Sequence, residues 1–170
     1  MSQVAALRMA FQGMHEFLEN TVADVTADQA AWQPPGRAHS IAANYAHVVA
    51  GEDGVINGMV RGGAPLLATG FAGKTGISEP PPQGFEWDDW AHRVSIDLPA
   101  LREYASAVYA ATDEYLTSIA DTDLERLIEL GPAGQFSLAR FLTIMMGNVA
   151  WHTGEIACLK GLQGAKGYPV

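Results

Sequence analysis

Residues 137–161 read SLARFLTIMMGNVAWHTGEIACLKG, and this stretch decides the fold prediction. Its apolar residues recur every three or four positions, which is the period of one face of an α-helix. The stripe consists of Leu138, Phe141, Met145, Val149, His152, Ile156 and Leu159. Ser137 is suited to cap the start of this helix, and Gly161 to end it. We therefore predict a long helix that buries one face and carries His152 on that face.

The same spacing predicts three further helices, over about residues 3–22, 40–59 and 87–119. Ser40 is suited to cap the second of them. Pro99 interrupts the third, where it should kink the helix or begin a new one, because proline lacks the amide hydrogen and clashes with the preceding turn. Gly131 and Pro132 predict a turn before the last helix.

A long connection, residues 61–84, separates the second and third helices and holds six glycines and four prolines. Connections of this length in compact domains are crossovers, lids or mobile segments. Its apolar residues Leu66, Leu67 and Phe71 predict that part of it packs against the helices. In a four-helix bundle, such a link allows parallel neighbours. We predict one all-α four-helix-bundle domain over residues 1–170, with this segment as the crossover.

Composition and charge narrow the function. The chain has 170 residues, of which 48% are hydrophobic, and a formal net charge of −9. The sequence has ten Lys and Arg residues against nineteen Asp and Glu residues, and the basic residues form no cluster. We therefore expect no nucleic-acid partner. No apolar run reaches the roughly 18 residues of a membrane-spanning helix, and the N-terminus lacks the pattern of a signal peptide. These features predict a cytoplasmic protein that does not enter a membrane.

Cys158 is the single cysteine, so it cannot form an internal disulfide. It stands in an apolar stretch, where we expect a small buried hydrophobic side chain.

Two of the five histidines are candidate metal ligands. The helical spacing turns His47 and His152 towards the interior, whereas we expect His15, His39 and His92 at the surface or at helix ends. A single buried imidazole is usually held neutral by one hydrogen bond. Two unpaired buried imidazoles on different helices would be costly, and one metal ion satisfies both. Neutral imidazole is a common ligand of zinc, nickel and iron.

Three residues near His47 and His152 in the sequence are candidates for a further metal ligand. Asn148 lies one helical turn before His152 and shares its face, but its neutral amide oxygen is a weaker ligand than a carboxylate or an imidazole. Glu155, three residues after His152, or Glu52, five residues after His47, would supply negative charge if either reached inward.

A stripe of Gly51, Gly54 and Gly58 continues the face of the second helix that carries His47. Each glycine costs roughly 1 kcal/mol of helix stability relative to alanine. Close packing of helices would offset this cost. The alternative is room for a ligand beside His47.

Three segments carry a resemblance to a known family: WQPP at residues 32–35, SIAANYAHVV at 40–49 and NVAWHTGEI at 148–156. Together they resemble the DinB/YfiT-like superfamily of metalloenzymes, over nearly the whole chain. The resemblance implies an up-down-down-up bundle and a divalent metal, often zinc or nickel, with open positions for water or a low-molecular-weight thiol. Relatives include mycothiol-dependent maleylpyruvate isomerases and bacillithiol transferases, and homodimers are common.

The resemblance also implies a ligand set. His47 matches the histidine of the second helix, and His152 matches the second of a pair of ligands on the last helix. The first of that pair, commonly His and sometimes Glu, is Asn148 in this sequence. The expected metal ligands are therefore His47, Asn148 and His152, with Glu155 as a further candidate.

Three functions remain open at this point. In the first, a metal at the catalytic residues His47 and His152 activates a thiolate or water, giving a thiol-dependent transferase or isomerase, or a hydrolase, that acts on a small molecule. In the second, the site has lost its metal, and Trp151 and Tyr45 line a small-molecule cavity. In the third, the protein is a structural dimer with the tryptophans and residues 61–84 at its interface.

Overall fold

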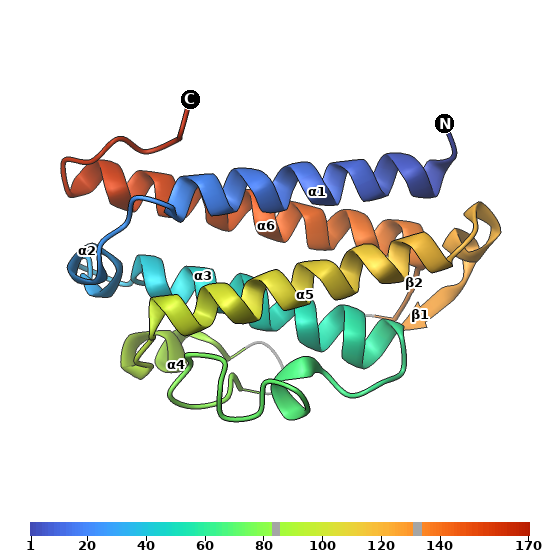
Figure 1. Ribbon diagram of the computed structural model, residues 1–170, viewed down its shortest axis with the longest axis horizontal. Helices are drawn as coiled ribbons and strands as arrows, with labels where there is room; N and C mark the ends of the chain where they lie inside the picture. Colours follow the sequence, from blue (N-terminus) through green and yellow to red (C-terminus); the bar gives the residue numbers. More distant parts are fainter. Residues whose placement is uncertain (83–85, 131–133) are drawn as a thin grey trace.

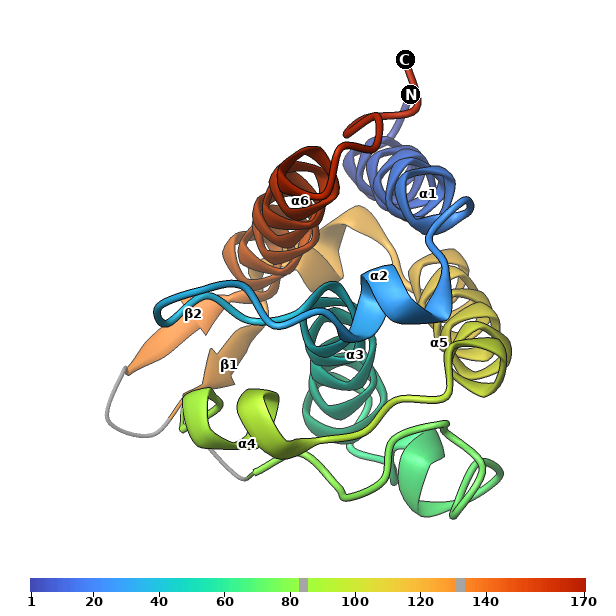
Figure 2. The same ribbon diagram turned by 90° about the vertical axis from the view of Figure 1, so that its left-hand side faces the viewer.

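The computed structural model describes residues 1–82, 86–130 and 134–170, and four long helical segments dominate it (Figure 1). They are α1 (Gln3–Val22), α3 (Ile41–Glu52) with its continuation η1 (Asp53–Val60), α5 (Leu98–Ser118) and α6 (Leu138–Leu162). Helix α1 packs against both α5 and α6, and α3 packs against α5 and α6 (Figure 2). The predicted all-α class is confirmed, and the up-down-down-up order of helix directions stays a prediction.

The remaining elements are short. They are α2 (Ala27–Ala31), η2 (Leu66–Ala68), α4 (Asp88–Arg93), η3 (Asp121–Glu125), β1 (Leu127–Glu129) and β2 (Gln135–Ser137). Strands β1 and β2 form an antiparallel pair in which Ile128 lies opposite Phe136, a feature that the sequence analysis did not predict. The predicted turn at Gly131 and Pro132, and the end of the predicted connection at Gly84, lie outside the described residues.

Helix starts follow the predicted caps. The side chain of Ser40 accepts a hydrogen bond from the amide of Ala43, and that of Ser137 accepts one from the amide of Arg140. Pro99 does not kink a continuous helix but stands in the first turn of α5, where its missing amide hydrogen costs nothing. The preceding residues form the separate helix α4 instead.

The second predicted helix is not α-helical throughout, because it widens into a π-helix at Asp53. The fully buried carboxylate of Asp53 accepts hydrogen bonds from the amides of Leu66 and Leu67, at 2.9 Å each, and from the hydroxyl of Tyr104 at 2.6 Å. These bonds attach the long connection to the helix. π-helical turns are rare and frequently occur at functional sites.

The buried hydrophobic side chains of the described residues form two clusters, a larger one around Tyr45, Leu101 and Val149 and a smaller one around Phe11 and Leu142. The first of them is the one beside α2 and α4. Leu66, Leu67 and Phe71 pack against this cluster, so the prediction that the connection packs down is confirmed. Cys158, expected to be buried, is exposed, because it lies off the stripe whose neighbouring members are Ile156 and Leu159. Among the described helices, none combines the length and apolar character needed to cross a membrane.

Candidate functional site

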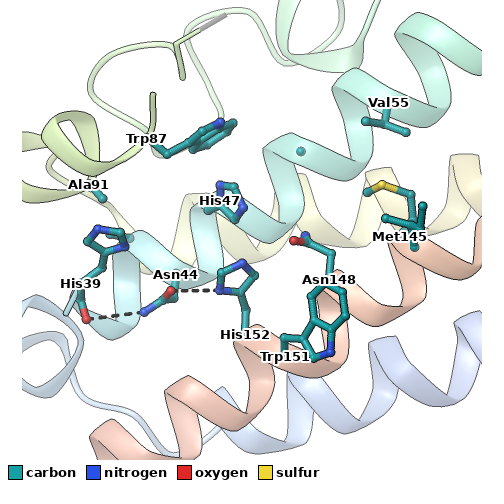
Figure 3. Close-up of a pocket in the computed structure, with 13 residues that line it drawn as sticks. His39, Asn44, His47, Val55, Trp87, Ala91, Met145, Asn148, Trp151 and His152 are labelled. Carbon is teal, nitrogen blue, oxygen red and sulfur yellow. Dashed lines mark hydrogen bonds between the residues drawn. The ribbon is translucent and has the colours of Figure 1, made fainter. Parts of the chain in front are cut away.

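A pocket of about 450 Å³ lies between α3, α6 and the start of α4 (Figure 3). This volume is within the range of small-molecule sites. Its lining residues are His39, Ala43, Asn44, His47, Gly51, Val55, Trp87, Ala91, Ile144, Met145, Asn148, Trp151 and His152. The walls are largely apolar, and the polar groups are concentrated around His47, Asn148 and His152.

Glycine makes room for part of this pocket. Among the described residues, no atom lies within 4 Å of a Cβ placed at Gly51 or Gly54, and Gly58 would gain only an ordinary contact with Pro65 at 3.7 Å. Close packing of helices therefore does not explain these glycines, and that interpretation was wrong. Gly51 instead lines the pocket on the face of α3 that carries His47, as the alternative anticipated.

His47 is an imidazole without its full set of partners. Its ring centre lies 4.7 Å from that of His152 and 4.1 Å from the ring of Trp87, both in edge-to-face geometry. Its Nδ1 atom is buried and has no hydrogen-bond partner among the described residues. Burial, then the nearby charges of His152 and His39, lower the pKa of His47 to about 4, against an opposing hydrogen bond with Asn148. His47 is therefore neutral at physiological pH.

The hydrogen bonds of His152 fix its tautomer. Its Nδ1 lies 2.6 Å from a carboxylate oxygen of Glu155 and 3.1 Å from Oδ1 of Asn44. The amide nitrogen of Asn44 donates to the carbonyl of Ser40, so its oxygen is the atom that faces His152. Because both neighbours are acceptors, Nδ1 carries a proton, and Nε2 is the ring nitrogen left available to a metal ion.

The amide of Asn148 points towards the space between His47 and His152, so the three expected ligands meet at one place (Figure 3). Two imidazoles bound to one zinc, with nitrogens about 2.0–2.1 Å away, would have ring centres roughly 5 Å apart. The observed separation of 4.7 Å agrees with this. Two imidazole nitrogens and an amide oxygen suit zinc or nickel, and the residues present fit such an ion.

Glu155 orients His152 rather than occupying a place among the ligands, since its carboxylate bonds the far nitrogen of the ring. A carboxylate on the second nitrogen of a metal-binding histidine is a common arrangement that fixes the ring and raises its basicity. Asn44 supports the same orientation. Sequence reasoning gave Asn44 no role in the site, although it lies three residues before His47 on α3.

Two predicted contributors lie elsewhere. Glu52 is fully buried on the other side of α3, bonded to His15 at 2.8 Å and Thr112 at 2.6 Å, because five residues rotate a helix by about 140°. Tyr45 is also buried away from the pocket, and its hydroxyl donates to Glu19. His15, expected near the surface, is buried and stacks on Tyr109.

A second group of metal-ligating residues at the rim of the pocket was missed. Candidate ligand atoms of His39, Asp88 and His92 all lie within 4.8 Å of one another, the one such group of three or more among residues 1–82, 86–130 and 134–170. Asp88 and His92 are four residues apart on α4, a spacing visible in the sequence. Their proximity to His39 depends on how α4 packs, which no local pattern reveals.

The fold and the pocket together define an all-α helical bundle with a histidine-lined cavity between two of its long helices. The model of the DinB superfamily matches residues 10–156, and the chain belongs to that superfamily. Its structure is similar to the crystal structure of a conserved protein from Enterococcus faecalis, with a TM-score of 0.80 at 20% sequence identity, over 95% of this chain and 97% of that one. That likeness concerns the fold alone. No curated protein matches the chain.

Proposed function

We propose that this protein is a metal-dependent enzyme that binds a divalent ion, zinc or nickel, through His47, His152 and Asn148 and acts on a small, largely apolar molecule. The observation that carries the proposal is the facing pair of imidazoles. His47 is neutral and has a buried nitrogen without a described partner, and His152 has its Nδ1 engaged by Glu155 and Asn44, so that its Nε2 is the nitrogen available to a metal ion.

The chain's own residues prepare the site. Glu155 and Asn44 hold a proton on Nδ1 of His152 and fix the orientation of the ring, which leaves Nε2 as its ligating nitrogen. Burial keeps His47 neutral for the same purpose. Asn148 supplies a neutral oxygen, which leaves the charge of the ion largely uncompensated.

A bound metal would polarise a substrate oxygen and lower the pKa of a coordinated water or thiol. Trp87 and Trp151 flank the ligands and present apolar surface to the substrate. From the activities that the family resemblance implies, we extend the proposal to transfer or isomerisation with a low-molecular-weight thiol as the second reactant. A homodimer in the cytoplasm is the assembly and location that we expect.

A metal-free binding protein is the second candidate, and Asn148 is the observation that favours it. An amide replaces a stronger ligand, and none of the described residues that line the pocket carries a carboxylate. In that case the largely apolar walls would bind a small molecule, and such a ligand would raise the melting temperature.

Elemental analysis of tag-free protein, after loading with zinc or nickel and removal of excess metal, tests the proposal. We expect His47→Ala and His152→Ala each to lose one equivalent that wild type retains. Cys158→Ser, an exposed change on α6, serves as the control and should keep full metal content. Asn148→His should tighten binding by adding a third imidazole. Unchanged metal content in both alanine variants, or no uptake by wild type, would overturn the proposal in favour of the metal-free protein.

A further inference from the structure

The rim group of His39, Asp88 and His92 is already close to the geometry of a metal site. Nε2 of His39 lies 3.0 Å from Oδ1 of Asp88. Two ligands of a tetrahedral zinc with bonds of 2.0–2.1 Å lie roughly 3.3 Å apart. The rings of His39 and His92 have centres 5.1 Å apart at 81°, near the roughly 5 Å expected of two imidazoles that share one zinc.

Hydrogen bonds prepare two of the three side chains. Nδ1 of His92 lies 2.8 Å from the backbone carbonyl of Asp88. A carbonyl only accepts, so Nδ1 carries a proton and Nε2 is the nitrogen available to a metal ion, the arrangement usual in metal-binding histidines. The ion pair with Arg37 keeps Asp88 as a carboxylate, and a zinc ion would displace the proton of the hydrogen bond between His39 and Asp88.

The positive charge of Arg37 would repel a metal ion bound to this group, and two observations limit that repulsion. It binds Oδ2 of Asp88 at 2.8 Å, which leaves Oδ1 on the side of His39. Its side chain is 88% exposed, so solvent screens its charge strongly. His92 is exposed as well and can adjust its rotamer to complete the ligand set, with water in the remaining position.

We propose that His39, Asp88 and His92 bind a zinc ion at the rim of the pocket, in a site distinct from that of His47 and His152. The ion would join the segment before α3 to α4, closing a loop between residues 39 and 88. Such a clip stabilises the folded chain because it restricts the unfolded one. It would also fix Trp87, the residue before Asp88, against the ring of His47. The inference does not depend on the proposed function.

Zinc stoichiometry of tag-free protein, measured by calorimetric titration and elemental analysis, tests the rim site. We expect two equivalents in wild type and one in His92→Gln or Asp88→Asn, with the rim affinity lowered roughly 100-fold or more, since even supporting residues of metal sites are worth 10–100-fold. Asp89→Asn is the matched control, an exposed neighbour on the same helix that is absent from the group. Zinc should raise the melting temperature of wild type more than that of His92→Gln.

The pattern of zinc loss among the variants shows which of the two sites binds zinc. Loss of separate equivalents in His92→Gln and in His47→Ala supports both sites. Full stoichiometry in both His92→Gln and Asp88→Asn, with loss in His47→Ala, overturns the rim site and leaves the proposed function intact. Loss in His92→Gln alone supports the rim site and removes the metal from the proposed function. No uptake by wild type overturns both.

Discussion

The two faces of α3 differ in how far the hydrogen bonds of their buried polar groups are satisfied. On the face towards α1 and α5, the carboxylate of Glu52 is fully buried and bonded to both His15 and Thr112. On the face towards α6, His47 is only partly buried, and its Nδ1 has no partner among the described residues. A buried polar group normally has its hydrogen bonds satisfied. The satisfied face is therefore structural, and the unsatisfied face is the one prepared for a ligand.

This comparison predicts that substitutions on one face of α3 change the stability of the protein, whereas substitutions on the other face change ligand binding. Changes on the Glu52 face should unfold the protein without a specific effect on metal or ligand. Changes on the His47 face should alter binding while stability stays the same or rises.

The largest effect is expected from Glu52→Ala. Removing one partner of a buried, hydrogen-bonded pair costs about 3–5 kcal/mol, because His15 and Thr112 are left without their acceptor. Urea denaturation would measure the loss of unfolding free energy. Glu52→Gln keeps a hydrogen-bonding group of the same shape and should lose less. A Glu52→Ala protein as stable as wild type would show that this face is not the structural one.

Acid should weaken the protein through His47. Its pKa in the folded protein, about 4, lies below the ordinary value of 6.5. Between these pH values the unfolded chain binds more protons than the folded one, so stability falls as pH falls through this window. At about 1.4 kcal/mol per pKa unit, the loss on going from pH 7 to pH 4 is of the order of 3 kcal/mol.

Urea denaturation of metal-free protein between pH 7 and pH 4 would show this loss, with His47→Gln as the reference. The difference between the two proteins removes the contributions of other titrating groups. If both curves had the same slope, the unfavourable burial of His47 would be contradicted.

Glu155→Gln should weaken metal binding without unfolding the protein. The carboxylate that orients His152 is worth about 10–100-fold in affinity. Its side chain is 57% exposed, so stability should change by less than about 0.5 kcal/mol. Titration of zinc into this variant and into His47→Ala would separate loss of orientation from loss of a ligand. Wild-type affinity in Glu155→Gln would contradict the orienting role.

The smallest effect is expected from Gly51→Ala. The added methyl meets nothing within 4 Å among the described residues, and alanine favours a helix over glycine by roughly 0.5–1 kcal/mol. The variant should therefore be more stable in thermal denaturation, yet bind pocket ligands less well, because the methyl occupies the cavity. Destabilisation would mean that Gly51 serves packing after all.

The sequence predicts most of the bundle because apolar spacing and caps are local properties. Ser40 and Ser137 cap the helices as expected. The apolar members of the predicted stripe on α6 are buried: Leu138, Phe141, Met145, Val149, Ile156 and Leu159. The π-helix escapes prediction because Asp53 is held by the distant residues Leu66 and Leu67. No periodicity within residues 40–59 reports those partners.

The candidate site also has a part that the sequence predicts and a part that it does not. Helical geometry brings Asn148 to the face of His152, and the pocket contains both of them with His47. Glu52 does not reach the site, because a residue five positions after His47 lies on a different side of the helix. The rim group depends on the packing of α4 beside the segment before α3, and tertiary contacts of this kind leave no pattern in a single sequence.

The bonds between Asp53 and the connection have a kinetic consequence. The amides of Leu66 and Leu67 belong to a segment without regular long helices, where rapid hydrogen exchange would ordinarily be expected. A fully buried carboxylate holds both of them, so their exchange should require the same opening that exposes the bundle core. This part of the connection would then unfold together with α3 and η1 as one cooperative unit.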